Sequence, residues 1–199
     1  MIDMNLYAKE FEEVFQKYDI NTPLRKAHFA AQVAHESNNM TVFTENLNYS
    51  VKALIKTFSR NRISIADAYR YGGHQGKSAN QKMIGNILYG GEYGKLNLGN
   101  INEDDGYTYR GRGPLQCTGR SNYKRFSQYF GVDFVKNPEL MAEPLNGLMF
   151  AGWYWMTHGL NTLADNDDLV KITRKINGGL KGIAERAAKL KQYKKYYNV

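Results

Sequence analysis

The segment that most constrains the fold is residues 23–37, which read PLRKAHFAAQVAHES. A helix through this segment is apolar on most of its faces, through Leu24, Ala27, Phe29, Ala30, Ala31, Val33 and Ala34. Such helices usually lie buried at the centre of a domain. Thr22 followed by Pro23 supplies an N-cap and a first turn. We therefore predict a central, buried helix whose C-terminal end carries a carboxylate, Glu36.

Apolar periodicity and capping residues predict further helices along the chain. They run from Met4 to Tyr18 with Asp3 as N-cap, after Ser50, after Ser64, after Asn80, near Ser121, from Pro144 to about His158, after Asp167 or Asp168, and as a basic helix at the end. A short strand is expected at 40–43, and residues 90–120, rich in Gly and Asn, are expected to be irregular and functional. The predicted fold class is mainly α. We expect a single domain of residues 1–199, with residues 50–90 forming a small helical lobe inserted into the main lobe.

The chain is strongly basic, with a net charge of +8 and a pI near 9.4. This charge favours an anionic partner such as nucleic acid, an acidic polymer such as a cell wall, or a membrane surface. Residues 171–195 carry nine Lys or Arg against Glu185 alone, and tyrosines interleave with the last lysines. Nucleic-acid binding, a solvated helix face and a surface that attracts an anionic wall all remain open from this pattern.

The single cysteine, Cys117, excludes an internal disulfide bond. Its apolar surroundings indicate a small buried side chain rather than a nucleophile. The N-terminal residues lack the apolar core of a secretory signal, and no run of 18 apolar residues follows. We expect a protein that folds in a reducing cytoplasm, without a signal peptide, and that depends on something else for release if its target lies outside.

Two carboxylates stand in contrasting surroundings nine residues apart. Glu36 ends the apolar helix, where burial and the negative end of the helix dipole help a carboxyl group keep its proton. Glu45 lies among Thr and Asn residues, where a carboxylate can stay charged and hold a water molecule. This contrast suits the acid and the base of a glycosidase. The simpler alternative, a helix-end surface charge and a solvated loop residue, stays open from spacing alone.

Two other motifs fail on inspection. His35-Glu36 resembles the start of an HExxH zinc motif, but position 39 is Asn where the second histidine should stand. The segment YGGHQGKS (71–78) resembles a phosphate-binding loop, but its first glycine is replaced by Tyr71 and no apolar strand precedes it. We therefore expect no metal and no nucleotide cofactor.

Five segments in order resemble the glycoside hydrolase family 19 chitinases, and most closely their phage endolysin branch. They are AHES, ENLNYS, the run YGG…LGN…DGYTYRGRGPLQCTGRSNY, WYWMTHGLN and ITRKINGG. The resemblance covers roughly residues 25–195, and it implies a lysozyme-like, mainly α fold with two lobes around an active-site cleft.

The resemblance also implies roles for individual residues. Glu36 matches the general acid. Glu45 matches the general base as the endolysin branch spaces it, whereas plant chitinases place their base further along. Thr118 matches a residue that helps to hold the attacking water. The implied substrate-binding residues are Gln116, Asn122, Tyr123, Asn177 and Arg186, and Arg186 also matches a late arginine near the acids. Family members invert the anomeric centre, so the two acids should stand roughly 6.5–9.5 Å apart.

Two departures from the family pattern stand out. Cys117 replaces the usual Leu or Ile, and residues 92–95 differ from the usual Arg-Leu-Gly-Asn, so no binding role is assigned there. The implied function is an endolysin that hydrolyses peptidoglycan. It would act as a monomer without metal or nucleic acid, would have no separate cell-wall-binding domain, and would be held in the host cytoplasm until a lytic pore opens. The alternatives are a chitinase, a nucleic-acid-binding helical protein and a lysozyme-fold protein that only binds sugar.

Overall fold

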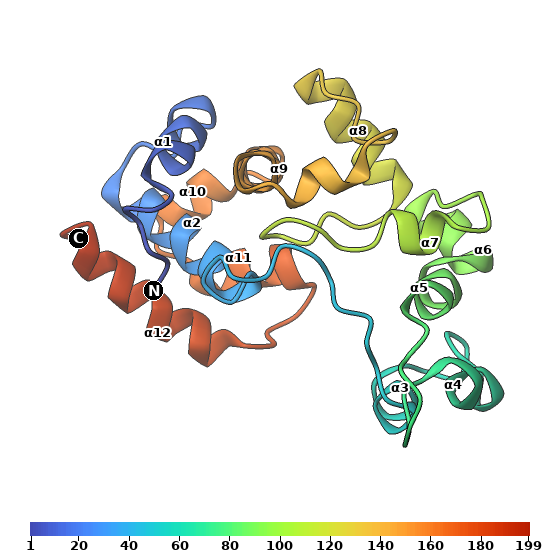
Figure 1. The fold of residues 1–199 in the computed structure, drawn as a ribbon. Helices are drawn as coiled ribbons and strands as arrows, with labels where there is room; N and C mark the ends of the chain where they lie inside the picture. Colours follow the sequence, from blue (N-terminus) through green and yellow to red (C-terminus); the bar gives the residue numbers. More distant parts are fainter. The chain divides into compact units, whose positions relative to one another are not determined.

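The computed structural model describes all 199 residues, and they form helices joined by turns (Figure 1). The β structure consists of isolated bridges such as Thr44 with Arg112, so the predicted mainly α class is confirmed. The strand expected at 40–43 is wrong. Asn38, Asn39 and Met40 have φ of 47°, 60° and 64°, which is a left-handed conformation that an extended strand excludes. No helix combines the length and the apolar character needed to cross a lipid bilayer.

The chain divides into two compact units. The first comprises Met1–Phe43, Gly113–Gln116 and Met141–Val199, and the second comprises Thr44–Arg112 and Cys117–Leu140. The small lobe predicted at 50–90 lies inside the second unit, which extends beyond it on both sides. Glu36 therefore belongs to the first unit and Glu45 to the second.

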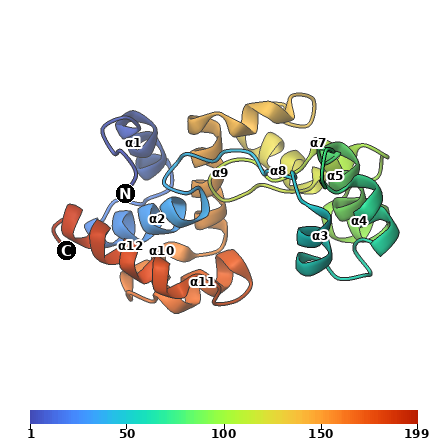
Figure 2. The same cartoon turned by 60° about the horizontal axis from the view of Figure 1, so that its bottom comes forward.

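The first unit is built around one helix. Its helices are α1 (Ala8–Lys17), α2 (Pro23–Glu36), α9 (Pro144–Thr157), α10 (Leu160–Asp165), α11 (Leu169–Asn177) and α12 (Ile183–Tyr196). Helix α2 packs along α12 and against α10, while α1 packs on α9 (Figures 1 and 2). The central position of α2 confirms the expectation from its apolar faces.

The local sequence explains why α2 forms and why it is buried. The Thr22 hydroxyl accepts a hydrogen bond from the Arg25 amide at 3.2 Å, which caps the first turn as predicted. The Phe29 ring is fully buried and meets the rings of Phe11, Phe15 and Trp155 edge-on, with centroid distances of 6.2, 6.0 and 5.4 Å. Such edge-to-face contacts are favourable between aromatic rings and fix α2 within the core.

Helix α1 begins later than its apolar stripe predicts. The Asp3 carboxylate accepts hydrogen bonds from the Asn5 and Leu6 amides at 3.1 and 3.3 Å, so it closes a turn instead of capping the helix. The helix proper starts at Ala8. Met4 is still buried by the preceding turn, which is why the apolar stripe extends further than the helix.

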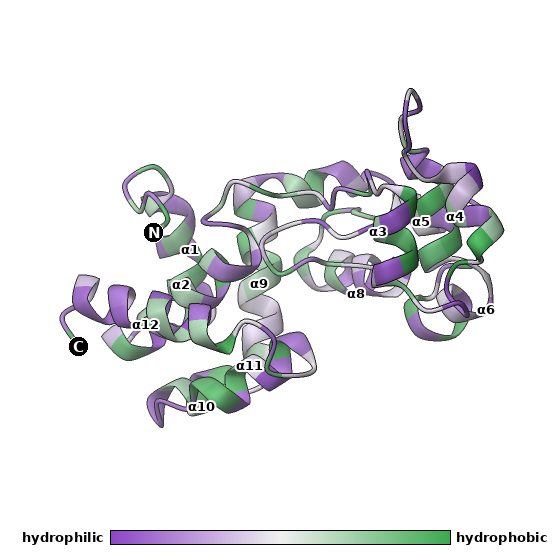
Figure 3. Cartoon of the chain, turned by 90° about the horizontal axis from the view of Figure 1, so that it is seen from below, coloured by the Kyte–Doolittle hydropathy of each residue, from purple (hydrophilic) through white to green (hydrophobic).

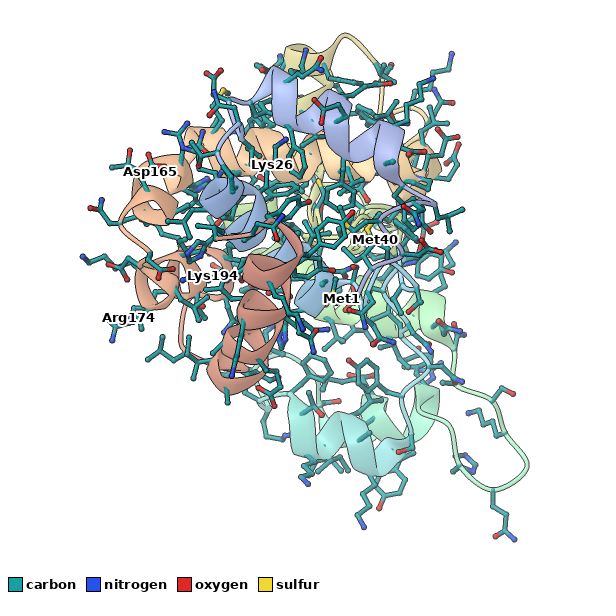
Figure 4. The ribbon with its side chains drawn as sticks, turned by 90° about the vertical axis from the view of Figure 1, so that its left-hand side faces the viewer. Met1, Lys26, Met40, Asp165, Arg174 and Lys194 are labelled. Carbon is teal, nitrogen blue, oxygen red and sulfur yellow. The ribbon has the colours of Figure 1, made fainter.

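Helix α12, near the C-terminus, packs on α2 and also binds the N-terminal residues. Hydrophilic and hydrophobic stretches alternate along it in Figure 3, and Leu190 and Tyr193 point into the core. The Tyr193 hydroxyl accepts a hydrogen bond from the Ile2 amide at 2.8 Å. Lys194, labelled in Figure 4, pairs with Asp167, whose other oxygen lies 2.7 Å from Nε2 of His28. His28 is fully buried on α2, so this chain of contacts connects α2, α12 and the turn before α11.

The second unit contains shorter elements. They are α3 (Val51–Thr57), α4 (Ile65–Tyr71), α5 (Gln81–Tyr89), α6 (Gly91–Tyr93), the π-helix η1 (Gly94–Leu98), α7 (Asp105–Thr108) and α8 (Arg120–Phe130), while the 3-10 helix η2 (Pro138–Ala142) spans the boundary. Ser50, Ser64 and Asn80 cap α3, α4 and α5 with their side chains, as predicted. Residues 90–120, expected to be irregular, instead contain α6, η1 and α7.

Candidate active site

Glu36 is the last residue of α2, and α12 supplies the group that holds its side chain. The Arg186 guanidinium donates Nη2–H to Oε1 of Glu36 and Nη1–H to the side-chain oxygen of Gln32, one helical turn earlier. Arg186 is 1% exposed and Glu36 is 21% exposed. The packing of α2 on α12 therefore fixes one carboxylate oxygen and leaves the side chain partly accessible.

This arrangement corrects two expectations. Arg186, expected as a late arginine near the acids, does lie beside Glu36, but its side chain is buried, which corrects the substrate-binding role also implied for it. Glu36 is expected in apolar surroundings, yet a buried cation stands beside it. Gln32, which anchors the guanidinium, was not predicted. It lies among the apolar residues of α2 and is fully buried. A polar amide in an otherwise apolar stretch is the one sequence signal that marks it.

His35 adds a neutral group beside this acid. Burial lowers the pKa of His35 from its ordinary value of 6.5, and the positive charge of Arg186 lowers it further. Its imidazole is therefore uncharged at neutral pH. Gly182, with φ of 73°, lies against the ring: a Cβ there would stand 2.5 Å from Nε2 of His35. A larger residue at 182 would displace His35, the neighbour of Glu36.

Glu45 is held by a different set of donors in the second unit. Its main-chain amide donates to the Gly111 carbonyl at 2.8 Å, and the Gly111 amide donates to Oε2 at 3.3 Å. The Tyr89 hydroxyl donates to Oε1 at 2.5 Å. Both oxygens of Glu45 thus face uncharged donors.

Tyr89 was not predicted as a site residue. Burial raises its pKa well above the ordinary value, and the charge of Glu45 raises it further. The hydroxyl therefore keeps its proton and remains a donor at physiological pH. The two residues are 44 positions apart, so no local pattern connects them.

The loop after Gly111 carries Gln116 and Thr118, and the first turn of α8 carries Asn122. Arg112 and Cys117 exchange main-chain hydrogen bonds of 3.1 and 2.8 Å across it. Gln116, with φ of 51°, donates its side-chain amide to the Gly113 carbonyl at 3.1 Å. Asn122 donates its side-chain amide to the Thr118 carbonyl at 2.8 Å. Thr118 and Asn122 are therefore brought together. Cys117 is free and buried, as its apolar neighbours predict.

The remaining predicted residues have other positions. Tyr123 is fully buried, donates its hydroxyl to the Arg110 carbonyl at 3.0 Å and accepts from Arg112 at 2.9 Å. It supports the loop and cannot contact a polymer, which corrects its predicted role. Asn177 ends α11 at the surface and forms no hydrogen bond to the other predicted site residues.

Comparison with known proteins gives a consistent family. The profile described as "Chitinase class I" matches residues 90–174. A glycosyl hydrolase family 19 domain-containing protein of Haemophilus influenzae is 37% identical over 164 residues, which is 82% of this chain and 75% of that protein. An acidic endochitinase of Solanum chilense is 47% identical over 57 residues, or 27% of this chain and 22% of that protein.

Solved structures agree in fold. A bacterial family 19 chitinase superimposes with a TM-score of 0.59 at 18% identity, covering 96% of this chain and 85% of the other. Chitinase C from Streptomyces griseus gives a TM-score of 0.59 at 19% identity over 96% and 84%. The order of motifs, the long match to the Haemophilus protein and the shared helical fold lead to one conclusion: this chain belongs to glycosyl hydrolase family 19 and is a chitinase-like enzyme that acts on glycosidic bonds.

Proposed function

We propose that the protein is a phage-type endolysin that hydrolyses the β-1,4 glycosidic bonds of bacterial peptidoglycan by inversion. In this proposal Glu36 is the general acid and Glu45 the general base. The protein acts as a monomer, leaves the host cytoplasm through a lytic pore, and lyses the cell. It needs no metal for this chemistry, because two carboxylates supply both proton transfers.

The observation that carries the proposal is that each of the two carboxylates is held in a fixed orientation by its own donors. Glu36 has one oxygen bound by a buried guanidinium, while its Oε2 forms no hydrogen bond and is available to a substrate. Glu45 has both oxygens held by neutral donors, Tyr89 and the Gly111 amide. Two carboxylates that are each oriented in this way can serve as the acid and the base of glycoside hydrolysis.

The proposed reaction follows from these roles. The proton on Glu36 moves to the bridging oxygen as the bond to C1 breaks. Glu45 takes a proton from a water molecule, which attacks C1 from the opposite face, with Thr118 helping to hold that water. The leaving sugar departs as an alcohol and the new reducing end forms with inverted configuration. Proton transfer of this kind contributes roughly 10²–10⁴-fold to a rate.

Charge supports peptidoglycan over chitin as the substrate. A net charge of +8 attracts an enzyme to an anionic wall, whereas chitin is uncharged. The matched endochitinases keep chitin as the second candidate, because a 57-residue stretch is 47% identical to one of them. Comparing the rates at which peptidoglycan and chitin are hydrolysed, at equal substrate concentration, separates the two candidate substrates.

The test is to incubate the purified protein with purified peptidoglycan and with chitin, and to identify the new reducing sugars. We expect release from peptidoglycan, with the α-anomer appearing first in proton NMR because a β bond is inverted. Release from chitin alone would replace peptidoglycan by chitin. A β-anomer as first product would contradict inversion, and no release from either polymer would contradict the enzymatic proposal.

A further inference from the structure

The second unit has a groove between α3 and α4, separate from the loop that holds Glu45. Its volume is about 660 Å³, and its lining residues are Val51, Lys52, Ile55, Lys56, Tyr69 and His74. The two helices pack against each other, side by side in Figures 1 and 2. Neither the sequence motifs nor the proposed chemistry gives this groove a role.

The groove is bordered by cations without acidic partners. Residues 50–78 contain six Lys or Arg and one acid, Asp67, whose carboxylate accepts a hydrogen bond from the Ser64 hydroxyl at 2.6 Å. Lys52 and Lys56 are exposed, stand one helical turn apart and form no ion pair. Their charges are available to a ligand that carries carboxylates.

The floor and one wall of the groove are apolar. Val51 and Ile55 line it from α3, and Tyr69 faces it from α4 with 62% of its surface exposed. Ile65, one turn before Tyr69, is 54% exposed. Large apolar side chains gathered beside free cations suit a ligand with alkyl groups and carboxylates close together.

The groove is held in shape by the main chain. The Val51 amide donates to the Gly73 carbonyl at 3.0 Å, and the Gly73 amide donates to the Tyr49 carbonyl at 2.9 Å. These two bonds join the start of α3 to the end of α4. Beneath them Leu54 and Ala68 are fully buried. A preformed groove of this kind loses little entropy on binding.

We propose that the α3–α4 groove binds the short peptides of peptidoglycan, whose alanine methyl groups and free carboxylates match its apolar floor and its two lysines. The inference rests on the proposed function and deepens it, because chitin carries no peptide. Val51 is six positions after Glu45, which limits their separation to roughly 20 Å of extended chain. A peptide of four or five residues spans roughly 13–18 Å, so a branch near the reacting bond reaches the groove.

An anionic lipid surface is the other ligand that lysines beside apolar side chains attract. The observations favour the peptide, because the free cations border a recess and the same unit carries Glu45. The peptides of a bound glycan strand are then present at a high effective concentration. Peptide recognition at this distance makes the groove a determinant of specificity and leaves bond cleavage to the two acids.

The first experiment compares two substrates that differ in the peptides, because an amidase replaces each peptide by the free lactyl carboxylate of the sugar. One is intact peptidoglycan, and the other is the same polymer after an amidase has removed its peptides. The variant Lys52→Glu/Lys56→Glu should lose about tenfold in kcat/KM on the intact polymer, since two weak attractions become two weak repulsions. Its rate on the stripped glycan should equal that of the wild type. An equal loss on both substrates, or no loss on either, overturns the proposal.

The matched control is Lys191→Glu/Lys195→Glu on α12. These two lysines are exposed, have the same spacing and change the net charge by the same amount. If lysines act only through the overall charge of the protein, both double variants lose the same factor in kcat/KM on the intact polymer. That result would refute a specific role of the groove. Circular dichroism and urea unfolding check that each variant is folded.

A second measurement is independent of catalysis. The wild type is titrated with a free alanine-containing tetrapeptide and with its amidated form, and amide NMR shifts are followed over residues 50–74. We expect shifts confined to the groove with the free acid, weaker shifts with the amide, and none in the Lys52→Glu/Lys56→Glu variant. This result can be obtained even if the enzyme cleaves only chitin, so the two proposals fail separately. A parallel titration uses phosphatidylglycerol vesicles. Peptide binding is overturned if the peptide causes no shifts, or if only the vesicles do.

Discussion

Replacing Arg186 by methionine tests how the candidate acid is positioned. The methionine side chain fills much of the same space but removes the guanidinium that binds Gln32 and Glu36. Gln32 is fully buried, and leaving its oxygen without a donor costs about 1–3 kcal/mol. Glu36 is 21% exposed, so water can hydrate its carboxylate once the guanidinium is gone. The cost of losing this ion pair is therefore smaller than the roughly 3–5 kcal/mol seen when a fully buried pair is broken. We expect a total loss of about 2–4 kcal/mol in the free energy of unfolding.

Urea unfolding followed by circular dichroism measures this loss. The midpoint should fall while the slope with denaturant stays the same, because the unfolded chain exposes the same surface. For a protein of this length, the expected loss lowers Tm by about 4–16 °C. The control is Lys191→Met on the exposed side of the same helix, which should change the free energy by less than about 0.5 kcal/mol.

A double-mutant cycle then assigns the effect to the contact. We expect the double variant Gln32→Met/Arg186→Met to lose less unfolding free energy than the sum of the two single variants, by about 0.5–3 kcal/mol. In each single variant one partner of the Gln32–Arg186 hydrogen bond remains buried without the other, whereas the double variant removes both. A loss below about 1 kcal/mol for Arg186→Met, or strictly additive changes in the cycle, would refute the view that this buried network holds Glu36 in place.

Three further changes test other contacts. Tyr89→Phe removes the 2.5 Å hydrogen bond to Glu45; kcat should fall about tenfold with little change in KM, and an unchanged kcat would separate Tyr89 from the base. Burial lowers the pKa of His28, so the unfolded chain binds a proton first and stability should fall as pH drops below about 6.5. His28→Gln should flatten that part of the urea midpoint profile, and a steeper profile would contradict the sign. Gly152→Val places a Cβ 2.2 Å from the Tyr18 ring and should cost at least about 1–3 kcal/mol in urea unfolding; a neutral result would mean that α1 and α9 can separate freely.

Helix positions could largely be predicted because their signals are local. Thr22, Ser50, Ser64 and Asn80 each precede an apolar periodic stretch, and each caps the helix that follows. Helix α10 was missed because six residues give too few turns for a periodic pattern. The strand expected at 40–43 failed because three successive left-handed residues turn the chain, a conformation that apolar spacing does not reveal.

The candidate site could be predicted only in part. The two glutamates stand out through their motifs, but the groups that hold them do not. Arg186 meets Glu36 across 150 positions, and Tyr89 meets Glu45 across 44. These contacts depend on how helices pack, so sequence alone points to the candidate acids and not to the side chains that orient them. Tyr123 shows the converse, since a residue inside a family motif proves to support the loop from within.

The central claim is that Glu36 and Glu45 cleave the glycan of peptidoglycan, and the most direct test compares reducing ends released by the wild type, Glu36→Gln and Glu45→Gln. All three proteins are assayed at equal concentration on the same purified polymer, after urea unfolding has shown that each is folded. The wild type should release reducing ends, and each variant should be slower by about 10²–10⁴-fold, because each lacks one proton transfer. A Glu36→Gln variant that works at the wild-type rate would contradict the account.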